Sequence, residues 1–146
     1  REAGEIVEMK FGVLTVSDTC FRGEAQDRSG PAVETILKGS FKECTVTRDC
    51  VADDRIAIQS ALHKWIDAEY TLVLTTGGTG FTERDVTPEA TRAVIEKEAP
   101  GIVAAMLSGS LKVTPMAMLS RPVAGICKRS IIVNLPGSSK VASCVT

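Results

Sequence analysis

The chain has 146 residues, 44% of them apolar and 24% charged, a balance that predicts one ordinary globular domain with a buried core. Its formal net charge is −1 and its basic residues are spread along the chain, which argues against a surface for nucleic acid or for an anionic membrane. The first nine residues contain three glutamates and no apolar run, so they predict neither a signal peptide nor membrane insertion.

The five cysteines form an odd set without a Cys-x-x-Cys pair, which disfavours both a disulfide framework and a structural zinc site. We therefore expect free thiols, a reducing compartment and a cytoplasmic protein. Cys44 and Cys50 flank an expected strand, and we interpret both as buried thiols, because free cysteine is among the most buried residue types.

The first half of the chain predicts two strands with a helix between them. Residues 1–8 are expected to be a flexible N-terminal segment, and the apolar, β-branched run 11–16 is the first strand. A Ser-Gly-Pro start and a glycine stop bound a short amphipathic helix over 29–39. The run 45–51 is less apolar and alternates only in part, which suits a strand near the edge of a sheet.

The next predicted helix begins near Asp54 and has one apolar face. Residues spaced at i, i+3, i+4, i+7 and i+8 should pack on the sheet: Ile58, Ala61, Leu62, Trp65 and Ile66. His63, the only histidine, falls on the opposite, polar face. A Ser-His-Asp or Cys-His mechanism would need an imidazole at the strand ends, so covalent hydrolase chemistry is disfavoured.

The second half of the chain also predicts strands that alternate with helices. Residues 71–75 are almost all apolar or β-branched and predict a central parallel strand covered on both faces. A helix is expected over 87–98, because Thr87-Pro88-Glu89 combine an N-cap hydroxyl, an N1 proline and a first-turn carboxylate. The segment 114–125 has no assignment, and 130–134 is the last strand.

A further helix is expected after Pro100, with a packing stripe made by Ile102, Ala105, Met106 and Gly109. The chain stops at Thr146, where another helix would be expected to begin. We therefore expect a C-terminal helix to be missing from the domain.

Alternating strands and helices predict an α/β fold, in which a three-layer domain over 9–146 has a mostly parallel sheet with helices on both faces. In such sheets ligands bind beyond the carboxyl ends of the strands. Three strand ends carry suggestive loops, which start at Ser17, Thr76 and Asn134, and we expect all three to open on one edge of the sheet.

The stretch Thr-Thr-Gly-Gly-Thr-Gly at 75–80 follows the central strand and predicts an anion site. Glycines permit positive φ and a close approach of the backbone to an anion, and threonine hydroxyls add donors. The stretch lacks the P-loop pattern and the dinucleotide-binding fingerprint, which disfavours those two classes. The alternative is a tight strand-to-helix turn, but three glycines and three threonines at a central strand end favour the anion site.

Aspartates in the predicted loops could serve this site. Asp85, just before a helix, could ligate Mg²⁺ or could simply complement the helix dipole. One of Asp53 and Asp54 should cap the helix that follows, which leaves the other for a metal ion. Asp18, at the end of the first predicted strand, is expected to lie at the same edge of the sheet.

Two basic residues could contact a phosphate group. Arg28 lies at the start of the first predicted helix and could equally pair with Asp27. Lys140 follows the last strand and could equally be a solvated surface lysine. Neither residue decides the question alone.

Six segments carry a family resemblance: 14–18, 27–30, 74–80, 84–91, 118–121 and 134–137. Together they resemble the molybdopterin adenylyltransferases, a family that includes the bacterial enzyme and the amino-terminal domain of gephyrin and its plant counterpart. The pairing of Thr-Thr-Gly-Gly-Thr-Gly with Arg-Asp-Val-Thr-Pro-Glu is highly specific, although the related domains of molybdenum-insertion proteins share a weaker version. The matches cover nearly the whole chain.

The resemblance implies the fold of molybdenum cofactor biosynthesis proteins and a homotrimer. It implies transfer of AMP from Mg-ATP, the co-substrate, to the phosphate of molybdopterin with release of pyrophosphate. The family's two functional aspartates match Asp53 and Asp85, which we expect to be catalytic and to ligate Mg²⁺. At the first of these the sequence departs from the family, since it reads Ala-Asp-Asp in place of Pro-Asp-Glu.

The remaining expected substrate contacts lie in the glycine loop, at the strand ends and at a position matching the family's ligand-binding serine. They are Ser17, Asp18, Thr76, Gly77, Gly78, Thr79, Gly80, Thr87, Pro88, Ser110, Pro136, Gly137 and Ser138. A fusion or partnership with a molybdenum-insertion domain is also implied.

Two other functions remain open at this point. One is a catalytically inactive, pterin-binding scaffold module of a gephyrin-like protein, which the presence of both aspartates argues against. The other is a nucleotide-binding domain that acts on a different phosphorylated small molecule.

Overall fold

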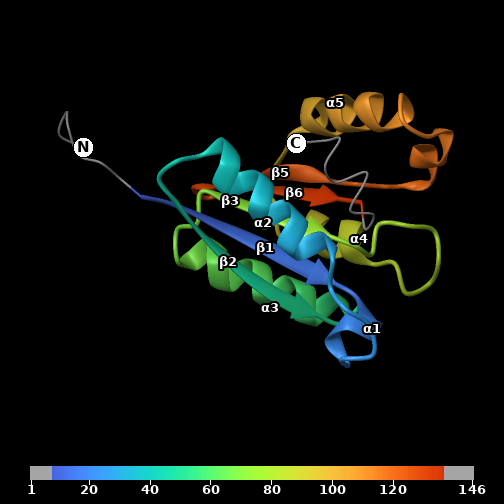
Figure 1. The fold of residues 1–146 in the computed structure, drawn as a ribbon, viewed down its shortest axis with the longest axis horizontal. Helices are drawn as coiled ribbons and strands as arrows, with labels where there is room; N and C mark the ends of the chain where they lie inside the picture. Colours follow the sequence, from blue (N-terminus) through green and yellow to red (C-terminus); the bar gives the residue numbers. More distant parts are fainter. Residues whose placement is uncertain (1–7, 137–146) are drawn as a thin grey trace.

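The structure is a computed structural model and describes residues 8–136. These residues form a six-stranded sheet with the order β2-β1-β3-β6-β5-β4 (Figure 1). The strands β2, β1, β3 and β6 run parallel to one another, whereas β5 is antiparallel to both of its neighbours. The predicted α/β class with a mostly parallel sheet is therefore confirmed.

The strands are β1 (Met9–Val16), β2 (Cys44–Val51), β3 (Leu72–Thr76), β4 (Lys97–Glu98), β5 (Ala124–Cys127) and β6 (Ser130–Leu135). All four strands predicted from the sequence are present, with ends that differ by one or two residues. As predicted, β2 lies at an edge of the sheet and β3 lies inside it.

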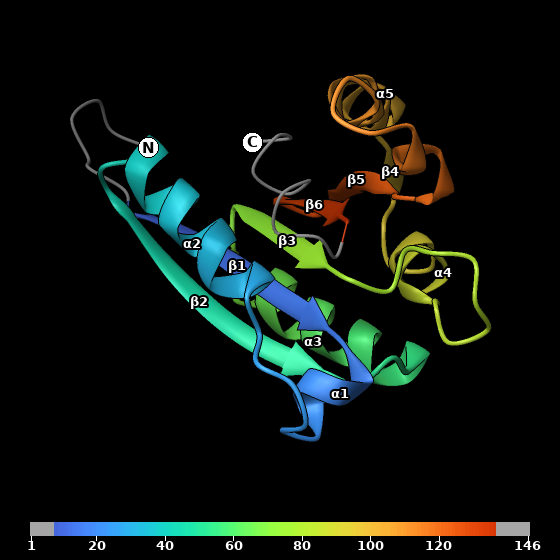
Figure 2. The same cartoon turned by 45° about the vertical axis from the view of Figure 1, so that its right-hand side comes forward.

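The helices are α1 (Asp18–Phe21), α2 (Ser29–Ser40), α3 (Arg55–Asp67), α4 (Thr87–Arg92), α5 (Pro100–Leu111) and the 3₁₀ helix η1 (Pro115–Leu119). Helices α2 and α5 cover one face of the sheet, and α3 and α4 cover the other (Figure 2). Side chains of β1 point to both faces of the sheet and so contribute to both hydrophobic cores. Phe11 and Val13 pack against the α2 side, while Leu14 and Val16 pack against the α3 side.

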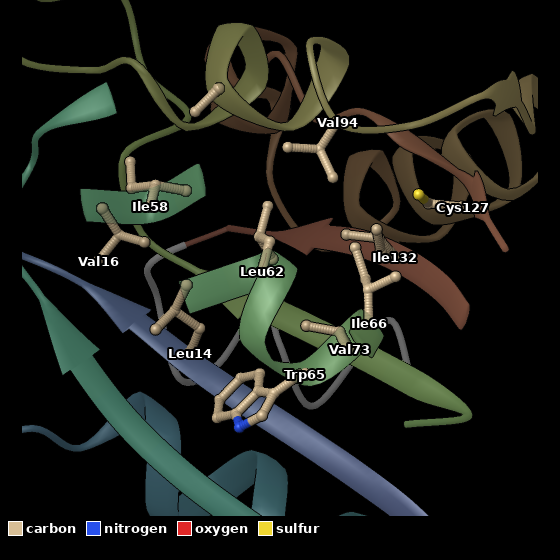
Figure 3. Packing of buried hydrophobic residues seen from close by; sticks show 11 residues of the cluster. Leu14, Val16, Ile58, Leu62, Trp65, Ile66, Val73, Val94, Cys127 and Ile132 are labelled. Carbon is tan, nitrogen blue, oxygen red and sulfur yellow. The ribbon is translucent and has the colours of Figure 1, made fainter. Parts of the chain in front are cut away.

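Figure 3 shows the core between the sheet and α3. The predicted apolar face of α3 is buried there through Ile58, Leu62, Trp65 and Ile66. Trp65 lies against β1 at Gly12, where an added Cβ would come within 2.4 Å of the indole Cε3 atom. The indole therefore requires glycine at this point of the strand. His63 is exposed on the opposite face of α3, as predicted.

The second half differs from the prediction in its helix boundaries. The helix predicted over 87–98 ends at Arg92, because residues 97–98 form β4 and pair with β5. Thr87 was expected to cap that helix, but the N-cap position falls at Val86 and the Thr87 hydroxyl donates instead to the Gly77 carbonyl at 3.0 Å. The unassigned segment 114–125 contains η1 and the start of β5.

Two burial predictions were wrong. Met106 and Ser110 are the buried residues of α5, whereas Ile102 and Ala105 of the predicted stripe are exposed. This helix is apolar around most of its circumference, so periodicity could not indicate which face packs. Cys44 and Cys50 are half-buried, because an edge strand is covered less than the strands inside the sheet.

The predicted flexible segment 1–8, except for Glu8, lies outside the described residues, as does the region where a C-terminal helix was expected to be missing. Within 8–136 no helix has the length and apolar character needed to cross a membrane.

Candidate active site

The carboxyl ends of three parallel strands lie level with one another. Thr15 of β1 is in register with Thr76 of β3, and Thr76 is in register with Leu135 of β6. The Thr76 hydroxyl also donates to the Pro136 carbonyl at 2.9 Å, which ties the glycine loop to the loop after β6. The strands β1, β3 and β6 therefore end on the same edge of the sheet, as predicted (Figure 1).

The glycine loop has a shape that only glycine can adopt without strain. Gly77 and Gly78 have φ values of +98° and +70°. A Cβ on Gly77 would lie 2.3 Å from the Val16 carbonyl oxygen, and one on Gly78 would lie 2.3 Å from the Thr87 Oγ1 atom. The loop is thus packed between the end of β1 and the start of α4.

Two cavities flank this loop. The first, here called the polar cavity, has a volume of about 510 Å³ and is lined by Thr15, Val16, Ser17, Cys20, Gln26, Asp27, Arg28, Ser29, Asp53, Thr76, Gly77, Gly78 and Asp85. The second, the apolar cavity, has a volume of about 390 Å³ and is lined by Gly78, Thr79, Gly80, Asp85, Met106, Leu107, Ser110, Thr114, Met116, Ala117, Leu119, Ser120, Pro122 and Pro136. Gly78 and Asp85 line both cavities, so the loop forms the wall between them.

The two predicted catalytic aspartates reach the same cavity from different elements. Asp53 follows β2, and its Oδ2 atom accepts a 3.0 Å hydrogen bond from the Asp18 backbone N–H. Asp85 follows the glycine loop, and its Oδ2 atom accepts from the backbone N–H and the hydroxyl of Thr82, at 2.9 and 2.8 Å. Within residues 8–136, the Oδ1 atom of each carboxylate has no hydrogen-bond partner.

The local charges favour a cation beside Asp53. Burial raises the pKa of Asp53 above the usual range, and the nearby carboxylates of Asp18 and Asp85 raise it further. Hydrogen bonds from Arg84 lower the pKa of Asp18, so that carboxylate stays ionised. Because the negative charge near Asp53 is only partly compensated, a divalent cation would be stabilised there.

The donor set fits Mg²⁺. This ion is usually held by one or two carboxylates together with substrate phosphate oxygens and water. Asp53 and Asp85 both line the polar cavity and each leaves one carboxylate oxygen available. No group of three or more His, Cys, Asp and Glu residues with metal-binding geometry occurs in the described part of the chain, so a site here would depend on the ligand's own oxygens.

The other predicted substrate contacts fall into three groups. Those that line a cavity are Ser17, Thr76, Gly77, Gly78, Thr79, Gly80, Ser110 and Pro136. Those that line neither cavity are Asp18, Thr87 and Pro88. Gly137 and Ser138 lie outside the described residues, as does Lys140.

Two of the residues that line neither cavity hold cavity-lining residues in place. The Asp18 backbone N–H donates to Asp53. Thr87 supports the glycine loop, because its hydroxyl donates to the Gly77 carbonyl and its backbone N–H donates to the Gly78 carbonyl. Pro88 is buried in the first turn of α4.

Ser110 and Arg28 each line one of the two cavities. The Ser110 hydroxyl lines the apolar cavity and has no partner among the described residues. Arg28 lines the polar cavity, and the structure gives no ion pair to Asp27 within 8–136. The Asp27 carboxylate accepts instead from the Thr15 hydroxyl and the Gly30 backbone N–H.

Asp54 caps α3 by accepting from the Ala57 backbone N–H, which confirms that one of Asp53 and Asp54 is a helix cap.

Three residues that brace the site were not predicted from the sequence. Arg84 forms a bidentate ion pair with Asp18. Arg121 donates to carbonyl groups of the glycine loop and of Asp85. Asn134 is fully buried and bonds β6 to Val123 and to two threonines. All three occur in segments of the family resemblance, but no local pattern indicates which distant residue each one contacts.

The layered fold and a glycine loop between two cavities define an α/β domain with a candidate ligand site at the carboxyl edge of its parallel strands. Residues 12–145 match the family described as "Probable molybdopterin binding domain", and the chain belongs to that family. The resemblance found in the sequence is thereby confirmed.

Two curated relatives and one solved structure illustrate the match. The chain is 47% identical over 131 residues to the Molybdenum cofactor synthesis protein cinnamon of Drosophila melanogaster, an alignment that covers 89% of this chain and 22% of that protein. It is 45% identical over 133 residues to the Molybdopterin adenylyltransferase of Helicobacter pylori strain J99, covering 89% and 75%. A molybdopterin biosynthesis protein from Mycobacterium abscessus superposes with a TM-score of 0.88 at 36% identity, covering 94% and 86%.

Proposed function

We propose that this domain transfers an adenylyl group from Mg-ATP to the phosphate of molybdopterin, as a step of molybdenum cofactor biosynthesis. One observation carries the proposal: Gly78 and Asp85 line two separate cavities at once. Two ligands that occupy those cavities would meet at a loop suited to phosphate. The name of the Helicobacter relative, which is matched over most of its length, supports the same chemistry.

The proposed reaction is a direct transfer. A phosphate oxygen of molybdopterin attacks the α-phosphorus of ATP, the new P–O bond forms, and the bond from that phosphorus to the bridging oxygen breaks as pyrophosphate leaves. His63, the only histidine of the chain, is exposed on α3 and lines neither cavity, so the proposed transfer uses no Ser-His or Cys-His nucleophile and no covalent enzyme intermediate. Catalysis would come from positioning and electrostatic stabilisation.

The residues of the chain would divide these tasks. The glycine loop would offer backbone N–H groups and hydroxyl donors to the phosphates, and Ser110 would donate to the ligand in the apolar cavity. Asp53 and Asp85 would hold Mg²⁺, which when bound neutralises charge on the phosphate oxygens. Arg28, which also lines the polar cavity, would add a positive charge there.

The deciding experiment mixes the protein with molybdopterin and ATP labelled at the α-phosphate. We expect label on the pterin product together with an equal amount of pyrophosphate, and neither without Mg²⁺. A protein that binds the pterin and releases no pyrophosphate would be the inactive scaffold module. Transfer to another phosphorylated compound in preference to molybdopterin would identify a different nucleotidyltransferase.

We also propose the homotrimer that the family resemblance implies and the cytoplasmic location expected from the cysteines. Exposed apolar side chains of α5 and η1, among them Leu111, Met116 and Met118, support self-association through that face. Free thiols at Cys20, Cys44, Cys50 and Cys127 agree with a reducing compartment. Sedimentation equilibrium should give three times the chain mass of 15.5 kDa.

A place within a longer protein is also proposed, in partnership with a molybdenum-insertion domain. The chain spans about a fifth of the length of the cinnamon protein, which leaves room there for other domains. Co-purification of this chain with a separately expressed molybdenum-insertion domain would test the partnership, and failure to associate at micromolar concentration would count against it.

A further inference from the structure

Arg121 lies outside both ligand cavities, yet it contacts the loop that separates them. It belongs to the extended segment between η1 and β5, and its backbone N–H donates to the Thr79 carbonyl at 2.9 Å. Its guanidinium donates through Nε to the Gly80 carbonyl at 2.8 Å and through Nη2 to the Asp85 carbonyl at 3.1 Å. One side chain therefore joins the two ends of the segment 80–85.

That segment determines where the Asp85 carboxylate lies. Thr82 holds the carboxylate through two hydrogen bonds, and the Asp85 backbone N–H donates back to Thr82 at 3.1 Å, so the segment is one compact turn. A Cβ on Gly80 would lie 2.7 Å from the Asp85 Oδ2 atom, which shows how closely the carboxylate packs on the loop. A change in the spacing of Gly80 and Asp85 would move the carboxylate.

The guanidinium is held from its far side as well. Its Nη1 atom donates to Glu89 Oε1 at 2.5 Å, in the first turn of α4. Burial by itself raises the pKa of Glu89, but the hydrogen bonds to its carboxylate and the positive charges of Arg121 and Arg55 together lower the pKa below the usual range, so the pair is ionic. Arg121 is thereby fixed to the helix that supports the glycine loop.

We propose that Arg121 is a positioning residue for Asp85, which sets the distance of that carboxylate from the glycine loop and from Asp53. The inference rests on the proposed function, because it assigns Asp85 to a site for the divalent cation. Three acceptors in different directions require the planar fork of arginine, and the single ammonium of lysine cannot reach all of them. Partners of this kind typically change metal affinity or activity about 10- to 100-fold when they are replaced.

The test compares Arg121→Lys with Arg92→Lys, an arginine-to-lysine change in α4 at a residue whose partner is Glu98. Binding of Mn²⁺ to the full chain is measured by electron paramagnetic resonance with α,β-methylene-ATP, an analogue that cannot be cleaved at the α,β position. We expect R121K to bind Mn²⁺ about 10- to 100-fold more weakly and R92K to match the wild type. In turnover assays, R121K should lower kcat and leave the KM for molybdopterin unchanged.

A rescue experiment separates positioning from folding. Arg121 is about one-third exposed, so a small cation can enter the space left in Arg121→Ala. Ethylguanidinium should restore Mn²⁺ affinity and methylammonium should not, because only the first supplies a planar fork. Wild-type Mn²⁺ affinity in R121K, or equal rescue by both cations, would overturn the inference, as would a loss of binding explained by loss of folded protein. Absence of AMP transfer by the wild type would refute the proposed function, while the Mn²⁺ measurements would still test Arg121.

Discussion

Asp18 and Asp53 hold each other through two reciprocal hydrogen bonds, each 3.0 Å long and each running from the backbone N–H of one residue to the carboxylate of the other. The end of β1 and the end of β2 are thereby joined at the rim of the polar cavity. Asp18 is fixed in turn by the bidentate pair with Arg84, which comes from the loop that carries Asp85. The two aspartates assigned to the cation are thus connected through a third aspartate that lines neither cavity.

Replacing Asp53 with asparagine should separate charge from geometry. The asparagine oxygen can still accept from the Asp18 N–H, so the rim should keep its shape, but the charge offered to Mg²⁺ is lost. We expect AMP transfer to fall by at least about 100-fold. Asp54→Asn is the matched control, because asparagine caps helices as well as aspartate does and activity should be retained. Retained turnover in D53N would remove Asp53 from the cation site.

We also expect D53N to change the pH dependence of stability. Burial raises the pKa of Asp53 in the folded state, so folding favours its protonated form and the charge destabilises the native state at neutral pH. D53N should therefore unfold at the same Tm as the wild type or a higher one near pH 7. The difference should shrink as the pH falls through the raised pKa towards the ordinary range for aspartate. A lower Tm for D53N at pH 7 would contradict this account.

Arg84→Gln should produce the opposite pH dependence. Hydrogen bonds from Arg84 lower the pKa of Asp18, so the stability supplied by this pair is fully present above the ordinary pKa of aspartate and is lost as the pH falls through the lowered value. Tm should therefore be lower in R84Q than in the wild type near neutral pH, and the two should converge in acid. Lys112→Gln is the control, since this exposed lysine has no ion pair among residues 8–136. A difference independent of pH would contradict the role of the pair.

The sequence predicted the parallel strands and the amphipathic α3 well, because burial on both faces leaves continuous apolar runs in the strands and one packed face leaves a 3.6-residue period in the helix. It failed where neighbours far away in the chain decide the structure. Residues 97–98 look helical until β5 is present to pair with them. Helix α5 is apolar on most sides, so no period marks the face that packs.

The candidate site could also be predicted only where local sequence patterns determine it. A glycine loop at a strand end and aspartates at two others follow from local patterns and from the rule that parallel strands end on one edge. The contacts that orient these groups do not, because Arg121 is 41 positions from Gly80 and 36 from Asp85. Such contacts become visible only when the fold brings η1 and β5 back to the glycine loop.

Gly78→Ala should disable the loop. Gly78 has a φ of +70°, and an added Cβ would lie 2.3 Å from the Thr87 Oγ1 atom and 3.1 Å from the Asp53 Oδ1 atom. We expect a loss of about 1–3 kcal/mol in the free energy of unfolding, together with loss of AMP transfer. Gly39→Ala is the control, because a Cβ there meets nothing within 4 Å and the residue lies in α2. That variant should be active and as stable as the wild type or more stable. Urea unfolding and turnover assays measure both effects.

Asn134→Leu should show that the glycine loop depends on a buried amide in β6. Asn134 is fully buried. Its Oδ1 atom accepts from the Val123 N–H at 3.0 Å, and its Nδ2 atom donates to the hydroxyls of Thr75 and Thr91 at 2.9 and 3.0 Å. Leucine has a similar volume but leaves the Val123 N–H without this acceptor, so we expect a loss of at least about 2 kcal/mol in the free energy of unfolding.

Ile131→Leu on the same strand is the control for this change. Ile131 is 38% exposed, and a substitution of similar volume there should lower the free energy of unfolding by about 0.5 kcal/mol or less.

The loss of Asn134 should also loosen the glycine loop, which lies between β3 and α4. Asn134 joins β6 to β3 through Thr75 and to α4 through Thr91. N134L should therefore lose amide-exchange protection at Thr76 and Gly77 in addition to its lower midpoint in urea. If it loses stability with unchanged protection there, the amide stabilises the sheet alone and the loop is held by its own contacts.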